Sequence, residues 1–402
     1  MHILLIHQAF TALDEPGGTR HYELARHLAG KGHRLTVIAS PVSYLTGVAS
    51  STPSQQENDD SQICLLRAYT YPALHRSFLH RILSFVSFMA SSFWIGLKVK
   101  QVDVVWGTSP PIFQGLTAWA LARLKGCPFL FEVRDLWPAF AVAVGVLRQP
   151  LLIRASTGLE HFLYRHAEQV VVNSPGFIEH VRAGGARQIE LVPNGVDISM
   201  FCQAENGEQL RRAWGLQDRF IVLYAGAHGL SNDLGVVLEA ADRLRTRPEI
   251  AIVLLGDGKD KPGLIKQAER QSLENVVFLP PLPKADMPQA LAAADACIAI
   301  LKPLQLYKTV YPNKVFDYMA ASRPVILSID GVIREVVEAA GAGLFVTPGD
   351  PIALAEAICR LADDSALGRA MGKRGQSYVA ANFNRQDQAE KLEMILLKLA
   401  RE

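Results

Sequence analysis

A short run of charged residues follows a strongly apolar segment in the first half of the chain. The sequence Phe131-Glu132-Val133-Arg134-Asp135 places two acids and an arginine at the end of a predicted buried strand. Ligands of parallel-sheet proteins bind beyond the carboxyl ends of the strands, so we expect Arg134 and Asp135 to serve a binding cleft. There they would bind a sugar, an acceptor or a phosphate. A structural ion pair between Arg134 and Asp135 is the alternative.

A second candidate site lies in the other half of the chain. Pro312-Asn313-Lys314 has the pattern of a helix start, with proline in the first turn. A helix N-terminus with free N–H groups and a lysine is a combination that binds phosphate. Asp317, one turn later, is expected to accept the two hydroxyls of a ribose. An ordinary surface helix is the alternative.

Glycines form a third candidate site. Gly17 and Gly18 lie between the first predicted strand and the first predicted helix, where backbone can approach a ligand or form a plain tight turn. The chain lacks a strict GxGxxG, because Gly256-Asp257-Gly258 is followed by Lys261 at the third glycine position, and it lacks GxxxxGK[ST]. These absences disfavour a dehydrogenase and a P-loop NTPase. No histidine spacing or Asp-x-Asp pair favours a metal, and no GxSxG motif favours a serine hydrolase.

The elements that would position these residues alternate along the chain. Apolar runs of strand length alternate with amphipathic helical stretches, which predicts an α/β fold with doubly wound parallel sheets. The alternation of predicted strands and helices begins again after a polar stretch near residues 203–208. We therefore expect a first domain over residues 1–200, a second over residues 201–383, and a closing helix over residues 384–402 that packs back on the first domain.

Composition narrows the function further. The chain has 402 residues, of which 49% are hydrophobic and 20% charged, and this excludes a disordered chain. A net charge of +2 offers no global field for nucleic acid, so we expect no nucleic-acid partner. The five scattered cysteines and a start without signal-peptide features favour the cytoplasm.

Residues 61–102 contain no acidic side chain and five Lys and Arg residues. Within this segment, residues 82–97 are uncharged and too short for a confident membrane span. Polar residues, among them Ser84, Ser87 and Ser91, are spaced for one helix face, with apolar residues opposite. We expect the stretch 76–100 to lie in the anionic surface of a membrane, on its cytoplasmic face. A core helix of the first domain is the alternative.

Together these motifs resemble the family 4 glycosyltransferases with the GT-B architecture, and within them the bacterial enzymes of O-antigen, capsule and exopolysaccharide synthesis. The resemblance covers nearly the whole chain, and its motifs occur in the family's order. The matching segments are Pro16-Gly17-Gly18, Leu24-Ala25 with Leu28, Gly32-His33 with Leu35 and Val37, Val133-Arg134-Asp135-Leu136-Trp137-Pro138, residues 192–197 with Phe201, Tyr224 with Gly226, Leu255-Gly256-Asp257-Gly258, Ala294-Asp295, residues 312–320 and Gly341-x-Gly343-Leu344.

The resemblance implies a function. The second domain would hold a nucleotide diphosphate sugar, the first would hold the acceptor, and transfer would retain the anomeric configuration without a metal or another cofactor. We expect the sugar to be an N-acetylated hexosamine or a deoxyhexosamine, and the acceptor to be a saccharide on polyprenyl diphosphate.

The resemblance also implies site residues. Arg134, Asp135 and Lys314 would be catalytic, and Gly17 and Gly18 would line the acceptor side. The expected donor-binding residues are Gly226, His228, Gly256, Asp257, Gly258, Pro312, Asn313, Lys314 and Asp317.

Five positions that depart from the family pattern bear on this site. Ala227 and Asn232 stand where many members carry an arginine and a lysine, so Lys314, helped by His228, must supply the countercharge for the diphosphate. Thr309 replaces the first of the family's paired glutamates. Arg134 aligns with a histidine that other members use near the reacting sugar, and Ala139 replaces an acid. Two alternatives remain, a nucleotide-sugar epimerase of the same fold and a non-catalytic sugar-nucleotide-binding protein.

Overall fold

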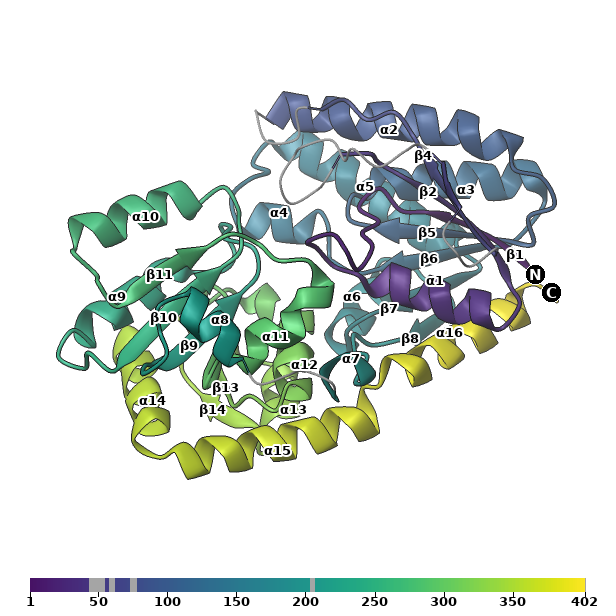
Figure 1. Cartoon of the computed structure of the whole chain (residues 1–402). Helices are drawn as coiled ribbons and strands as arrows, with labels where there is room; N and C mark the ends of the chain where they lie inside the picture. The colour runs from purple at the N-terminus through teal and green to yellow at the C-terminus, as the bar shows by residue number, and fades with distance from the viewer. Residues whose placement is uncertain (43–54, 58–61, 73–77, 203–206, 402) are drawn as a thin grey trace. The chain divides into compact units, whose positions relative to one another are not determined.

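Two α/β units make up the chain (Figure 1). The computed structural model describes residues 1–42, 55–57, 62–72, 78–202 and 207–401. Unit 1 comprises residues 1–12, 17–193 and 386–402, and unit 2 comprises residues 13–16 and 194–385. Each unit contains a parallel, doubly wound sheet, so the predicted α/β class is confirmed. The units divide at residues 193/194, shortly before the expected position at 200/201.

The sheet of unit 1 runs in the order β3-β4-β2-β1-β5-β6-β7-β8, counting the strands in the described residues. Every neighbouring pair is parallel except β3 with β4. The central strands are apolar and buried along their length, as expected for a parallel sheet covered on both faces. The strands are β1 (His2–Ile6), β2 (Arg34–Ala39), β3 (Gln55–Glu57), β4 (Ile63–Arg67), β5 (Val104–Ser109), β6 (Phe129–Val133), β7 (Gln169–Val172) and β8 (Ile189–Leu191).

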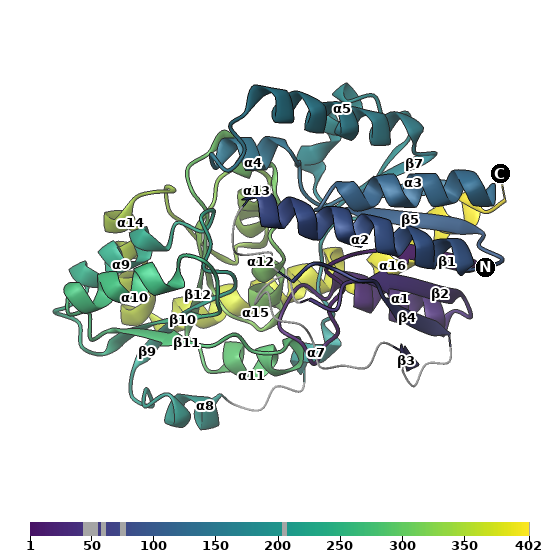
Figure 2. The same ribbon diagram turned by 90° about the horizontal axis from the view of Figure 1, so that it is seen from above.

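Helices cover both faces of this sheet. In Figures 1 and 2, α1 and α16 lie on one face, and α2, α3 and α5 lie on the other. The helices of unit 1 are α1 (Arg20–Gly30), α2 (Phe78–Lys98), α3 (Phe113–Lys125), α4 (Ala139–Ala143), α5 (Pro150–His166), α6 (Ile178–Ala183) and α16 (Arg385–Leu399), with the 3₁₀ helix η1 (Pro175–Phe177).

The last helix of the chain belongs to the core of unit 1. Leu392 and Leu396 of α16 are buried in the cluster that contains Leu24 of α1 and the strand residues beneath it. At the surface of the same contact, the Glu393 carboxylate lies 2.8 Å from Nε2 of His33. Residues from the two ends of the sequence therefore build one hydrophobic core.

Helix α2 exposes part of its predicted apolar face. Ser84 is buried, whereas Leu83, Val86 and Trp94 are exposed, with 66% of Trp94 accessible. The Ser87 hydroxyl instead donates to the carbonyl of Ser84, a bond within the helix that satisfies it without water. The exposed residues belong to the predicted apolar face, and contact of this segment with a membrane stays a prediction. Residues 76 and 77 of the expected segment lie outside the described residues. No helix in the described residues is long and apolar enough to cross a membrane.

Unit 2 repeats the architecture on a smaller sheet in the order β11-β10-β9-β12-β13-β14, again counted over the described residues. Its strands are β9 (Phe220–Ala225), β10 (Ile250–Leu255), β11 (Val276–Leu279), β12 (Ala296–Ile300), β13 (Val325–Ser328) and β14 (Gly343–Phe345). Its helices are α7 (Ser199–Cys202), α8 (Glu208–Ala213), α9 (Leu234–Arg243), α10 (Lys261–Arg270), α11 (Met287–Ala292), α12 (Asn313–Ala320), α13 (Val332–Ala340), α14 (Pro351–Asp363) and α15 (Ser365–Asn382), with the 3₁₀ helices η2 (Lys284–Asp286) and η3 (Gln305–Thr309).

Candidate active site

Two loops meet at the carboxyl ends of β9 and β10 in unit 2. A Cβ atom on Gly256 would lie 1.8 Å from the carbonyl oxygen of Gly226, and one on Gly258 would lie 2.4 Å from that of His228. The backbone of His228 also donates to the carbonyl of Asp257 over 2.8 Å. Only glycine permits this approach, so two predicted donor-site glycines, Gly256 and Gly258, let the two loops pack together.

Lys314 lies beside these loops, in the first turn of α12. Its Nζ lies 3.9 Å from the ring centroid of Tyr224, and a Cβ on Gly226 would lie 2.8 Å from Nζ. Nζ is buried and has no hydrogen-bond partner in the described part of the chain. Burial lowers the pKa of the Lys314 ammonium to about 7. An anion that is absent from the described residues would pair with this amine and favour its charged form.

Two further polar groups at this place are buried without partners. Among the described residues, neither ring nitrogen of His228 nor Oδ1 of Asn313 makes a hydrogen bond. Burial lowers the pKa of His228 to about 4, and the charges of Lys261 and Lys314 add to this effect. A buried polar group without a partner costs about 1–3 kcal/mol, so three such groups beside one glycine-lined loop point to a ligand site.

The sequence did not single out the residue that fixes the second loop. Lys261 at the start of α10 donates to the carbonyls of Gly256, over 2.7 Å, and Leu279, over 2.8 Å. The carboxylate of Asp257 accepts from the N–H of Gly258. Lys261 thus holds the Gly256-Asp257-Gly258 turn to the end of β11.

Asp317 has a partner that the sequence pattern did not indicate. Its Oδ2 lies 2.6 Å from Nζ of Lys284, and both side chains are largely buried. One residue further on, the Tyr318 hydroxyl accepts from the N–H of Ala225 over 3.0 Å and ties α12 to β9. The expected contact of Asp317 with a ribose stays a prediction, now for a carboxylate already oriented by a lysine.

Unit 1 holds a second polar cluster, centred on Glu132 in β6. The carboxylate accepts from Nε of Arg20 over 2.9 Å and from the Trp106 indole over 3.2 Å, and it lies 2.7 Å from Nε2 of His21. Burial by itself would raise the pKa of Glu132, but His21 and Arg20 outweigh it and hold the carboxylate ionised. All four side chains are buried, so the cluster is a fixed part of the core.

Arg134 extends this cluster towards the end of β6. Its NH1 lies 3.2 Å from Nε2 of His7 and 3.1 Å from Nδ1 of His21. Burial raises the pKa of Asp135, the next residue, to about 7, although the charge of Arg134 opposes this, and Asp135 adds to the high pKa of Tyr164 in α5. The structure therefore brings Arg134 together with two histidines, and its charge also acts on Asp135.

His7 and His21 are the members of this cluster that the sequence reasoning passed over. His7 directly follows β1 and His21 lies in the first turn of α1, so both occupy the carboxyl-end position that singled out Arg134. Gly17 and Gly18 immediately precede that turn and are exposed. A Cβ on Gly17 would lie 2.9 Å from Oγ1 of Thr11. The acceptor role of the two glycines stays a prediction.

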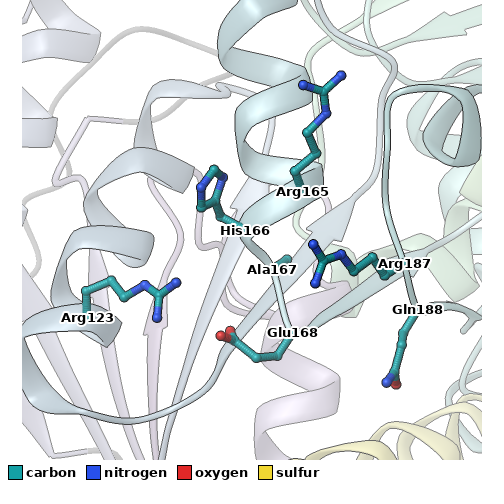
Figure 3. Close-up of a pocket in the computed structure, with 7 residues that line it drawn as sticks. All are labelled: Arg123, Arg165, His166, Ala167, Glu168, Arg187 and Gln188. Carbon is teal, nitrogen blue, oxygen red and sulfur yellow. The ribbon is translucent and has the colours of Figure 1, made fainter.

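A pocket of about 530 Å³ lies at the other end of the strands of the unit 1 sheet, at their amino ends (Figure 3). Glu168 and Gln188 in its wall directly precede β7 and β8, at the amino ends of the strands. Its other wall residues are Arg123, Arg165, His166, Ala167 and Arg187. No predicted site residue lines this pocket. The described residues contain no group of three or more His, Cys, Asp or Glu side chains arranged to hold a metal ion.

Comparison with known sequences gives matches in both units. Residues 17–195 match the glycosyl transferase 4-like domain, and residues 219–364 match the domain called glycosyl transferases group 1. The chain is 25% identical over 320 residues to the putative colanic acid biosynthesis glycosyl transferase WcaI of Escherichia coli, covering 77% of this chain and 78% of that protein. It is 23% identical over 280 residues to the probable glycosyltransferase WbjE of Pseudomonas aeruginosa, covering 67% and 69%.

Solved structures share the fold along almost the full length. A sucrose-phosphate synthase from Thermosynechococcus elongatus superimposes with a TM-score of 0.81 at 19% identity, covering 99% of this chain and 98% of that one. Anabaena HepE, solved in complex with UDP and glucose, superimposes with a TM-score of 0.74 at 17% identity, covering 99% and 100%. With both sequence domains matched in order and both units folded accordingly, the chain belongs to the family 4 glycosyltransferases and has the GT-B fold.

Proposed function

We propose that this glycosyltransferase moves a sugar from a nucleotide diphosphate sugar to a lipid-linked saccharide during synthesis of a cell-surface polysaccharide, with retention at the anomeric carbon. The observation that carries the donor assignment is the buried amine of Lys314, without a partner among the described residues and beside Gly226. The similarity to WcaI, a putative colanic acid biosynthesis enzyme, supports the polysaccharide pathway.

The proposed chemistry follows from charge. Transfer leaves a nucleoside diphosphate, and its developing charge needs preorganised cations and N–H donors. Lys314 and the free N–H groups at the start of α12 supply both, and the buried His228 offers a further donor after protonation or through its neutral N–H. Asp317 would bind the ribose, and Arg134 in unit 1 would contact the transferred sugar. No metal is needed in this proposal.

Kinetics of Lys314 variants test the donor site. We expect Lys314→Met to lower kcat/KM by about 10²–10³-fold, the usual loss when one donor to a developing anion is removed. Lys314→Arg should recover part of the rate because the cation returns. Lys266→Met removes an exposed lysine of α10 and is the matched control.

The assay uses a panel of nucleotide sugars, including N-acetylated hexosamine and deoxyhexosamine donors, with polyprenyl-diphosphate-linked saccharides and EDTA present. Unchanged donor KM and kcat in a Lys314→Ala/Asp317→Ala double variant would contradict the site. A new epimer formed from donor alone identifies an epimerase instead, and tight donor binding without turnover identifies a binding protein. Proton NMR of the product anomer checks retention.

We also propose that helix α2 docks unit 1 on an anionic membrane. Its outward row of Leu83, Val86, Trp94 and Leu97 is apolar at helical spacing, and Lys98 and Lys100 follow directly. Such a helix lies in a membrane interface with its apolar side chains inserted and its cations against lipid phosphates. This docking would bring unit 1 to the membrane in which the lipid of the acceptor is embedded.

Liposome flotation tests the docking. We expect Leu83→Glu/Trp94→Glu to lose most binding to vesicles containing 30% phosphatidylglycerol (about a third anionic lipid, to engage the basic residues). Ile352→Glu/Met394→Glu makes the same charge change at two exposed apolar residues elsewhere and should float like the wild type. Equal flotation of the two double variants, or no flotation of the wild type, rejects docking through α2.

A further inference from the structure

The contacts of Arg134 fix the hydrogens on two buried histidines. A guanidinium only donates, and NH1 carries two hydrogens, one for Nε2 of His7 and one for Nδ1 of His21. Both of these ring nitrogens must therefore be unprotonated. Each ring then keeps its hydrogen on the other nitrogen, at Nδ1 in His7 and at Nε2 in His21.

The other nitrogen of each ring has a matching acceptor. Nδ1 of His7 lies 2.8 Å from the Thr108 hydroxyl, and Nε2 of His21 lies 2.7 Å from the Glu132 carboxylate. The Thr108 hydroxyl is held in turn by Nε2 of Gln114 over 2.8 Å. Both rings thus accept from Arg134 at one side and donate to the protein at the other.

Burial supports the same protonation states. His7 and His21 are almost fully inaccessible, and their rings lie 4.0 Å apart. Burial lowers the pKa of His21 to about 4 although Glu132 opposes it, and burial, His21 and Arg134 lower the pKa of His7 well below its usual range. Two imidazolium rings this close to each other and to Arg134 would repel, so the neutral pair is the stable state.

We propose that His7 and His21 are positioning residues that, as neutral acceptors, aim the guanidinium of Arg134 at the transferred sugar. The proposal rests on the proposed function, in which Arg134 contacts that sugar. Arg134 directly follows β6, its NH1 contacts two buried rings, and a guanidinium keeps its charge at physiological pH.

Paired amide substitutions separate the two bonds of each ring. Gln places its amide group, with an oxygen acceptor and an NH2 donor, near Nε2 of histidine, and Asn places the same group near Nδ1. His7→Gln and His21→Asn therefore keep an acceptor for Arg134, whereas His7→Asn and His21→Gln keep the bond to Thr108 or Glu132 and lose that acceptor.

We expect His7→Asn and His21→Gln to lower kcat by about 10–100-fold with donor KM within about twofold of the wild type, the usual loss when the support of a site residue is removed. Their partners His7→Gln and His21→Asn should recover most of the rate. Thermal unfolding should shift similarly within each pair, since each variant deletes one buried hydrogen bond. Equal kcat within both pairs overturns the positioning role.

A measurement independent of activity accompanies the kinetics. Long-range ¹H–¹⁵N spectra of the wild type, assigned with His7→Gln and His21→Asn, should show both rings neutral from pH 5.5 to 8.5 (a window that brackets the ordinary histidine pKa of about 6.5), with the Nδ1–H form at His7 and the Nε2–H form at His21. An imidazolium at either position overturns the proposal. A wild type without transferase activity would instead reject the proposed function, and the spectra would still decide the state of the rings.

Discussion

At the residue scale, Lys314 combines burial with the absence of a hydrogen-bond partner among the described residues. A lysine in such a place is partly neutral at physiological pH, because burial disfavours the ammonium. A bound diphosphate would reverse this preference by pairing with the charged form. In the proposed function, protonation of Lys314 and binding of the donor would therefore be coupled.

This coupling predicts that donor binding weakens as the pH rises above 7. The pKa of Lys314 in the free protein is about 7, and the bound diphosphate raises it, so binding takes up a proton between those two values. We expect the donor Kd to increase by up to about tenfold per pH unit from pH 7 to 9, the linkage limit for one proton. His228, with a pKa of about 4, stays neutral over this range.

Isothermal titration calorimetry at pH 8, in two buffers of different ionisation enthalpy, measures the proton uptake directly. Lys314→Arg is the control, since its guanidinium stays charged and its Kd should change little with pH. A wild-type Kd that is constant from pH 7 to 9 would refute the coupling.

Residue types at strand ends predicted part of the candidate site. The chain leaves a strand or enters a helix at Arg134, Lys314 and the glycines of unit 2. Such positions can be predicted from the neighbouring residues in the sequence. The contact of Asp317 with Lys284 and of Arg134 with His7 depends on which strands and helices become neighbours. That information is non-local, so the sequence pattern did not contain it.

At the element scale, the alternation of strands and helices was predictable because buried parallel strands are continuous apolar runs. The side of α2 that packs on the protein was not predictable in the same way. Ser84 is buried, and the Ser87 hydroxyl donates to a carbonyl one turn back, which satisfies it without water. Serine spacing therefore does not tell which side of a helix packs on the protein, and Leu83, Val86 and Trp94 of the predicted apolar face are exposed.

At the scale of the whole molecule, the core of unit 1 is completed by α16, which is separated in sequence from the rest of the unit by residues 194–385 of unit 2. Leu396 is fully buried there. The closing helix was predictable from its amphipathic pattern, and its core partners are residues at the other end of the sequence.

We expect Leu396→Ala to lower the free energy of unfolding by about 2–5 kcal/mol, the range for a leucine removed from a packed core. Met394→Ala in the same helix is the control, because this side chain is 65% exposed and its loss should cost little. Urea unfolding followed by circular dichroism measures both. Equal losses in the two variants would mean that α16 does not contribute to the core as described.

The place of α16 has a consequence for biosynthesis. Synthesis makes most of unit 1 before residues 194–385 of unit 2 and α16 after them, so unit 1 lacks part of its hydrophobic core until α16 has been made. Unit 2 is contiguous from residue 194 to 385, apart from the short segment 13–16, and has all of these residues available earlier. The order of folding on the ribosome would then run against the order of the sequence, with the second unit formed before the first is complete.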